Sequence, residues 1–148
     1  MSSPLLHLTT KRDMYRLASA ITPDGEWSFA EFERRLGRAL GGVEVRYMEL
    51  TEFTVGDLTG LAVWSADRST AIIGVPAVAS SDHKIHIAGH EAWHLLARHE
   101  GCGRCTAAEV DAETFALRLG SQIARRKSRR DRQSLDLATA FGVVGLGA

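Results

Sequence analysis

Five of the chain's six histidines lie in one stretch, His83-Lys84-Ile85-His86-Ile87-Ala88-Gly89-His90-Glu91-Ala92-Trp93-His94-Leu95-Leu96-Ala97-Arg98-His99. Within this stretch stands the pattern His90-Glu91-x-x-His94. Residues four apart in an α-helix are separated by about 40° around its axis, so both imidazoles lie on one face and can bind one zinc ion. With Asp82 near its start and Gly101 beyond its end, the pattern predicts a helix over residues 81–99 that carries a metal site.

Glu91 lies about 100° around the predicted helix from His90, beside the ion rather than on the ligand face. There it can accept a proton from a water activated by the ion and later deliver it to a leaving amine, the role of this motif in zinc peptidases. The alternative is a pair of ordinary surface or core histidines. Because the composition gives on the order of 0.02 accidental matches to the pattern, we favour Glu91 as a catalytic residue and His90 and His94 as zinc ligands.

A catalytic zinc site uses three protein ligands and keeps a fourth position open for water. Residues 106–127 have the apolar periodicity of an amphipathic helix, and three acids, Glu109, Asp111 and Glu113, lie near its start. Glu109 lies beside the apolar side, where a carboxylate costs desolvation energy unless it is paired or bound to a metal. We therefore predict Glu109 as the third ligand and Asp111 as its rival. Stabilisation by the helix dipole is the alternative role for these acids.

Three further groups of residues near the motif have metal-binding chemistry. Glu113 shares the face of Glu109, and we expect it to hydrogen-bond the free ring nitrogen of a ligating histidine. His83 and His86 can substitute as ligands or line the cleft, but we interpret them as a solvated helix cap. Cys102 and Cys105 resemble half of a zinc knuckle, yet a closed structural site needs four ligands and the chain has no other cysteine. We therefore expect an ordinary pair of loop thiols.

The rest of the chain alternates between helical and strand-like patterns. The expected elements are a helix over residues 11–20, a helix that begins at a capping box of Ser28 and Glu31 and ends at Gly41-Gly42, strands over 43–50, 61–64 and 70–75, and a short separate helix over 131–141. The turn between the second and third strands predicts a hairpin. We expect the three strands to form an antiparallel sheet.

Basic residues are concentrated near the end of the chain. Seven of the 18 basic residues lie between Arg118 and Arg132, together with one acid, Asp131. Such a run can bind nucleic acid or an acidic partner. No aromatic side chain or base-reading motif is interleaved with it, so we interpret the cluster from Arg125 to Arg132 as a solvated helix end, whose cations oppose the negative pole of the helix dipole.

Length and composition are those of an ordinary globular chain. The 148 residues contain 18 basic and 18 acidic residues, and 45% are hydrophobic, which predicts one domain with a true core and excludes a disordered or disulfide-stapled chain. No apolar run approaches the roughly 20 residues that cross a bilayer, and the N-terminus has no secretory signature. We therefore expect a cytoplasmic protein with no membrane segment.

Taken together, the motifs resemble those of the ImmA/IrrE family of bacterial metallopeptidase-like proteins. A strand pair over residues 61–64 and 70–75 precedes His90-Glu91-Ala92-Trp93-His94-Leu95-Leu96, and Glu109-x-Asp111-Ala112-x-x-Phe115-Ala116-x-x-Leu119 follows. The resemblance covers roughly residues 26–120. It implies a minimal zincin core in which His90, His94 and Glu109 bind Zn²⁺ and Glu91 is the general base.

The same resemblance implies a function and a partner. Members of the family cleave or disable a helix-turn-helix repressor, so it implies a zinc-dependent endopeptidase that acts on a helix-turn-helix transcription factor or an antitoxin-like protein. The alternative is a metal-binding regulatory or toxin–antitoxin partner protein without useful protease activity. A third, weaker alternative is a hydrolase that uses the basic cluster to bind nucleic acid.

We therefore expect a single α+β domain of zincin type over residues 1–148. Its parts are an N-terminal helix, a small three-stranded antiparallel sheet, the helix with the His-Glu-x-x-His motif and a following ligand-bearing helix. The expected boundaries are an N-terminal arm over 1–25, a metallopeptidase core over 26–128, and a basic helix and tail over 129–148.

Overall fold

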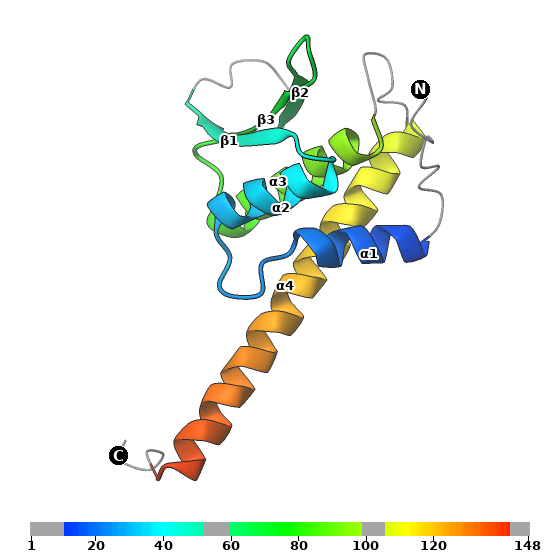
Figure 1. Cartoon of the computed structure of the whole chain (residues 1–148). Coiled ribbons are helices and arrows are strands. Elements are labelled where there is room, and N and C mark those ends of the chain that lie inside the picture. Colours follow the sequence, from blue (N-terminus) through cyan, green and yellow to red (C-terminus); the bar gives the residue numbers. More distant parts are fainter. Residues whose placement is uncertain (1–10, 52–59, 99–105, 143–148) are drawn as a thin grey trace.

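The computed structural model describes residues 11–51, 60–98 and 106–142, and these segments form an α+β fold (Figure 1). This confirms the expected class. The four helices and three strands, in chain order, are α1 (Lys11–Ile21), α2 (Phe29–Ala39), β1 (Glu44–Leu50), β2 (Leu61–Trp64), β3 (Thr70–Pro76), α3 (Ser81–Leu96) and α4 (Thr106–Ala140).

The sheet has the strand order β1-β3-β2 and is mixed. The hairpin prediction is confirmed, because β2 pairs antiparallel with β3 from Leu61↔Gly74 to Trp64↔Ala71. The expectation of a fully antiparallel sheet is wrong, because β1 pairs parallel with β3 over its whole length. Alternating burial along β1 reports that one of its faces is covered and carries no information about strand direction. The nearly continuous apolar run of β3 suits its central position between two neighbours.

Helices α2 and α3 cover one face of the sheet (Figure 1). Val45 of β1 and Ala71, Ile73 and Val75 of β3 are buried in the core. The residues that alternate with Val45 on β1 are exposed, namely Glu44, Arg46 and Met48. The sheet is therefore half-buried, as its alternating pattern predicts, and its covered face supports the helix that carries the motif.

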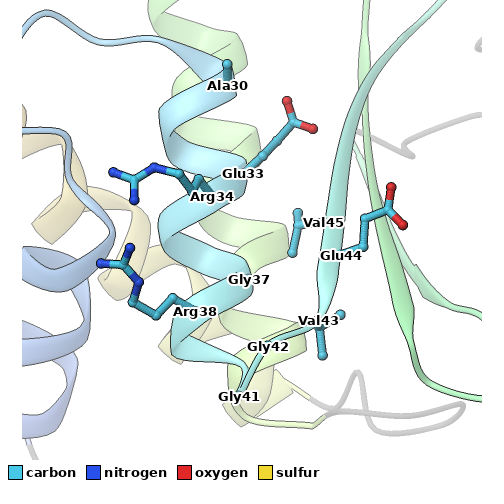
Figure 2. A pocket seen from close by; sticks show the side chains of 10 residues that line it. All are labelled: Ala30, Glu33, Arg34, Gly37, Arg38, Gly41, Gly42, Val43, Glu44 and Val45. Carbon is cyan, nitrogen blue, oxygen red and sulfur yellow. The ribbon is translucent and has the colours of Figure 1, made fainter.

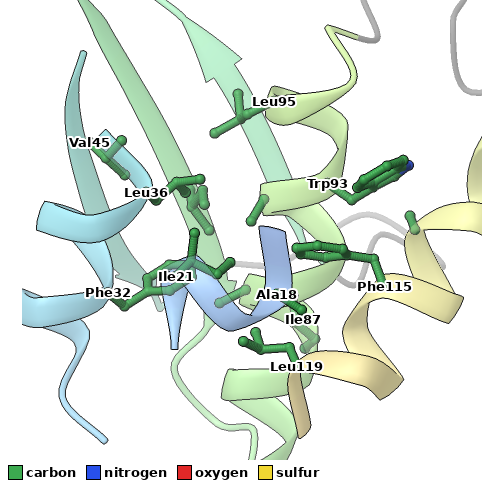
Figure 3. Close-up of a cluster of buried hydrophobic side chains, with 14 of the residues drawn as sticks. Ala18, Ile21, Phe32, Leu36, Val45, Ile87, Trp93, Leu95, Phe115 and Leu119 are labelled. Atoms are coloured by element: carbon green, nitrogen blue, oxygen red, sulfur yellow. The ribbon is translucent and has the colours of Figure 1, made fainter. Parts of the chain in front are cut away.

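The core joins all four helices to the sheet (Figure 3). Trp93 of α3 packs against Phe115 of α4 with ring centroids 5.1 Å apart. Helix α1, which lies in the segment expected to be an N-terminal arm, contributes Ala18 and Ile21, both fully buried. Burial is continuous along α3 from Ile87 to Leu95, so the motif is held in a rigid setting.

Helix α4 is a single 35-residue helix. The expected break between residues 127 and 131 is wrong, because the chain there consists of Arg, Lys, Ser and Asp with no glycine or proline to end a helix. The helix ends before Gly142, whose φ of 68° is the left-handed conformation that glycine favours beyond a C-terminus. Within the described segments, no helix has the length and apolarity that crossing a membrane requires.

Helix α2 begins as predicted at Ser28, whose hydroxyl accepts a hydrogen bond of 3.1 Å from the Glu31 amide. The Glu31 carboxylate departs from the capping-box expectation by turning to Arg34 and Arg35. These arginines lower the pKa of Glu31 to about 2 through their hydrogen bonds, Arg34 having the larger effect.

Gly37 marks a close approach between α2 and the start of β1. A Cβ atom there would lie well inside van der Waals contact with the Val43 carbonyl oxygen, which belongs to the backbone and has little freedom to move. We expect Gly37→Ala to lower the free energy of unfolding by about 1–3 kcal/mol, measured by urea denaturation. Gly120→Ala is the matched control: nothing lies within 4 Å of its added Cβ, so it should raise the free energy of unfolding by about 0.5–1 kcal/mol. Equal effects of the two changes would contradict this account.

Candidate metal centre

The motif residues lie at the buried centre of α3. The helix begins at the N-cap Ser80, whose hydroxyl accepts a hydrogen bond from the His83 amide, which confirms the predicted start at residue 81. It ends at Leu96, earlier than predicted. His90, Glu91 and His94 are only 9%, 1% and 2% exposed. Burying three polar side chains is costly unless each has a partner, so their surroundings decide what the site can do.

Helix α4 brings Glu109 against the two histidines. The Nε2 atoms of His90 and His94 are 3.3 Å apart. One Glu109 oxygen, Oε2, lies 2.9 Å from His90 Nε2, and the other, Oε1, lies 3.0 Å from His94 Nε2. We call His90, His94 and Glu109 the His–Glu group. The structure thus brings together the three residues predicted as ligands, and they could hold a metal ion.

The spacing of these donor atoms fits a shared ion. Ligands about 2.0–2.1 Å from a tetrahedral zinc ion are about 3.3 Å from one another, close to the separations in the His–Glu group. Glu109 Oε1 is buried and makes no hydrogen bond within the described residues, although His94 Nε2 is 3.0 Å away. The two atoms are thus close without the alignment of a hydrogen bond. A metal ion bound at this point could take both atoms as ligands.

Glu113 contacts the ring nitrogen of His90 that points away from Glu109. Its Oε1 lies 2.7 Å from His90 Nδ1, which leaves His90 Nε2 directed at Glu109. This confirms the expected contact between Glu113 and a ring nitrogen of His90, while the role of His90 as a metal ligand stays a prediction. Burial raises the pKa of Glu113, but hydrogen bonds from His86 and His90 outweigh this effect and hold the pKa below its ordinary value.

His86 is more closely tied to the site than the solvated cap that its position predicts. Its Nε2 lies 3.0 Å from Glu113 Oε2, so one carboxylate joins His86 to His90. The exposed His83, together with His86, His90 and Glu113, lines a hollow of about 210 Å³. The spacing of His83, His86 and His90 places all three on one side of α3, which is a signal that the sequence carries. The acid that joins two of them, Glu113, lies on α4, and the sequence does not show that the two helices meet there.

Asp111, the rival ligand, is exposed and lies outside the His–Glu group. It follows Glu109 by two residues and so lies about 200° around α4 from it. Cys102, Cys105 and His99 lie outside the described residues.

Gly60, which the sequence analysis did not single out, lies against the predicted catalytic residue. A Cβ atom at this position would be 3.2 Å from Glu91 Oε1 and would collide with the Ile87 side chain. Gly60 directly precedes β2, so the absence of its side chain lets the edge of the sheet approach the Glu91 carboxylate. A glycine directly before a strand is a common feature, and only the fold shows what it faces.

A close contact between α3 and α4 at Gly89 sets the distance between the predicted ligands of the two helices. A Cβ atom at Gly89 would lie 2.8 Å from Leu119 Cδ2 and 3.4 Å from the Ala116 Cα atom. Helices α3 and α4 therefore cross closely at the residue next to His90. This crossing places Glu109 and Glu113 within reach of the histidines.

A larger hollow of about 870 Å³ lies elsewhere, between α2 and β1 (Figure 2). Its charged walls are Glu33, Arg34, Arg38 and Glu44. No residue of the His–Glu group lines it. Although this hollow is larger than the one beside His90, it contains none of the predicted metal ligands, so the candidate site remains the one on α3.

Two of the three acids near the start of α4, Glu109 and Asp111, give a direct test of the third ligand. We expect Glu109→Gln to weaken zinc affinity by at least about 10²-fold, because it replaces a carboxylate that contacts both histidines with a neutral amide. Asp111 is exposed and lies about half a helical turn from Glu109, so Asp111→Asn should leave the zinc affinity within about twofold of the wild-type value. Competition with a chromophoric chelator measures both affinities. Equal losses, or a larger loss for Asp111→Asn, would contradict the assignment.

Comparisons with protein-family models, with curated proteins and with solved structures found no match for this chain. The resemblance to the ImmA/IrrE family therefore stays a prediction that rests on the quoted motifs. What the chain does has to be inferred from the His–Glu group and its surroundings.

Proposed function

We propose that this chain is a zinc-dependent endopeptidase that cleaves a specific regulatory protein. The observation that carries this proposal is the convergence of His90, His94 and Glu109 from two helices on one point. Two imidazoles and one carboxylate are a ligand set of catalytic zinc, which leaves a fourth position open. A purely structural zinc site would use four protein ligands.

Each residue around the His–Glu group has a chemical task in this proposal. Zinc held there would polarise the scissile carbonyl and lower the pKa of the attacking water to about 7. Glu91 follows His90 directly on α3 and would accept the proton of that water and pass it to the leaving amine. Glu113 fixes the His90 ring, and the packing of Trp93 on Phe115 holds the two helices together.

The resemblance to the ImmA/IrrE family supports a helix-turn-helix transcription factor or antitoxin-like protein as the substrate. The small hollow beside the site, about 210 Å³ and lined by His83, His86 and Glu113, favours a selective enzyme over a general protease.

The test is metal-dependent cleavage of a candidate regulator. A helix-turn-helix protein that co-purifies with this chain, or is encoded beside it, is incubated with the zinc-loaded protein, with the chelated protein, and with chelated protein given zinc again. We expect defined fragments by intact-mass spectrometry in the first and third samples only. A regulator that binds but stays intact in all three would contradict the proposal.

The burial of the site favours a second candidate, a metal-binding partner protein that regulates without cutting. Glu91 and His94 are almost fully buried, whereas a peptidase must admit a polypeptide to its catalytic residue. In the same experiment, this candidate requires the regulator to bind only in the presence of metal and to remain intact.

A further inference from the structure

The second half of α4 extends away from the rest of the fold (Figure 1). Helices α1 and α3 pack against α4, and the contact with α1 reaches as far along α4 as Arg126. From Asp131 to Gly142, every described residue except Ala138 is exposed. Because no other described element lies beside it, this half of the helix is accessible from several sides.

The stretch of α4 that leads into this projecting part differs in charge from the rest of the chain. Residues 118–132 contain seven of the 18 basic residues and one of the 18 acidic residues, so the remainder contains eleven basic and seventeen acidic residues. A neutral chain is thus divided into a basic stretch of α4, residues 118–132, and an acidic remainder. Such an asymmetry steers the molecule so that the basic stretch of α4 approaches a polyanion before the rest of the fold does.

The helix dipole does not account for these charges. The dipole acts within the last turn of a helix, and the last turn of α4 contains no basic residue. The sequence-based interpretation of a solvated helix end therefore fails for this cluster, because the cluster lies inside the helix.

Contacts with the body account for two of the basic residues. Arg126 donates hydrogen bonds to the Ser19 carbonyl oxygen and hydroxyl at 3.0 and 3.1 Å and lies 3.3 Å from an Asp24 carboxylate oxygen. Arg130 donates to the Asp24 carbonyl oxygen at 3.1 Å. These two arginines fasten α4 to α1 and to the turn that follows it.

Three other arginines form a stripe on a different side of α4. Arg125, Arg129 and Arg132 follow one another at i, i+4 and i+7, so they lie within about 60° of one another and extend about 10 Å along the axis. The side of Arg126 and Arg130 is about 110° away. All three are exposed, and none forms an ion pair with another described residue, although Arg125 also contacts the Tyr15 hydroxyl of α1. With Ala124 and Ser128 they line a shallow hollow of about 350 Å³.

We propose that this arginine stripe binds the phosphates of duplex DNA, with the part of α4 that carries the stripe lying in the major groove. Guanidinium groups bind phosphate oxygens in pairs of hydrogen bonds, and the small side chains of Ala124 and Ser128 leave room for them. A B-form major groove, about 12 Å wide, admits one α-helix. The deep, narrow major groove of duplex RNA does not.

The composition of the segment argues against the other polyanionic partners. Residues 125–134, which contain the stripe, have no apolar side chain, and the exposed Leu135, Leu137 and Phe141 lie beyond the stripe, nearer the end of the helix. A protein interface gains most of its binding energy from buried apolar and aromatic anchors, and a membrane-surface helix needs an apolar face to insert. A chain of phosphates needs neither, and its binding requires only the cations that this segment supplies.

Salt dependence and a charge-matched control test the proposal. Binding of a short labelled DNA duplex is followed by fluorescence anisotropy at about 50–200 mM salt. Three phosphate contacts give a slope of about −2.7 in log K against log salt, so the affinity should fall about 40-fold over this range. The triple variant Arg125→Gln, Arg129→Gln and Arg132→Gln should bind at least about 10-fold more weakly at the lowest salt, with a slope near zero.

The control removes the same number of charges from the body, through Arg12→Gln, Arg16→Gln and Arg38→Gln on α1 and α2. It should keep the affinity within about twofold, and thermal unfolding should show that both triple variants are folded. Equal losses in the two variants, or no loss in the stripe variant, would overturn the proposal. Tighter binding to anionic lipid vesicles or to polyglutamate than to duplex DNA would overturn it too.

Chelation separates this proposal from that of the metal centre. Arg125 lies about 24 Å along α4 from Glu109, so DNA binding should be the same with and without chelator. If the chain binds DNA but cleaves no regulator, the peptidase proposal is refuted and the proposal of a DNA-binding stripe is supported. DNA binding that disappears with the metal would instead refute an independent arginine stripe.

Discussion

Replacing His94 with alanine should lower the affinity for zinc by at least about 10³-fold. Changing a carboxylate that only supports a metal ligand costs roughly 10–100-fold, and His94 is a predicted ligand whose Nε2 atom lies 3.3 Å from His90 Nε2 and 3.0 Å from Glu109 Oε1. Without it, two protein donors remain, which is fewer than catalytic zinc sites use. His90→Ala should have an effect of similar size, because His90 contacts Glu109 and Glu113 together.

Elemental analysis and thermal unfolding would measure this effect together. At a zinc concentration of about 100 times the dissociation constant, the wild-type chain should gain about 2.7 kcal/mol of stability, because the ion binds only the folded state. His94→Ala should gain almost none. His83→Ala is the matched control, since His83 is an exposed histidine of the same helix and its loss should leave one zinc ion per chain. If His90→Ala and His94→Ala both retain stoichiometric metal, the ion is bound elsewhere and the site is wrongly assigned.

The part of the site that lies on one helix could be predicted from the sequence. The placement of His90 and His94 on one face follows from helix geometry alone, and α3 has the start that its cap residues predict. Glu109 required a further physical argument, the cost of a carboxylate beside an apolar face. The structure places Glu109 against the histidines because α4 packs its apolar side on α3, while metal binding by Glu109 stays a prediction.

Features that depend on how separate elements meet could not be predicted. The direction of β1 depends on the path of the chain before β2, which alternation does not encode. The contact of Gly60 with Glu91, and of Gly89 with α4, joins residues far apart in sequence. The continuity of α4 differs from the expected break because arginine favours helix and residues 127–131 contain no glycine or proline to end one.

Glu91→Gln should abolish cleavage of the regulator, by at least about 10²-fold, while the chain keeps its zinc and its fold. Glu91 lies outside the His–Glu group, so its loss removes no ligand. Glutamine has nearly the same shape, which preserves packing at a residue that is almost fully buried. Its amide cannot accept the proton of the attacking water, and loss of a general base costs about 10²–10⁴-fold in rate.

Two further measurements make this prediction specific to proton transfer. Zinc content and thermal unfolding of Glu91→Gln should match the wild type, because a loss of metal would assign Glu91 a structural role instead. Gly60→Ala disturbs the same carboxylate from another side, since its Cβ would lie 3.2 Å from Glu91 Oε1. It should reduce cleavage with zinc still bound.

The decisive experiment measures, in cells that carry Glu91→Gln, both cleavage of the regulator and relief of repression. If the chain acts as a peptidase, Glu91→Gln should bind the regulator, leave it intact and fail to relieve repression. A partner protein that works by binding alone does not need a proton acceptor at residue 91. Full relief of repression by Glu91→Gln, with the regulator intact by mass, would therefore refute the peptidase and establish the metal-binding partner in its place.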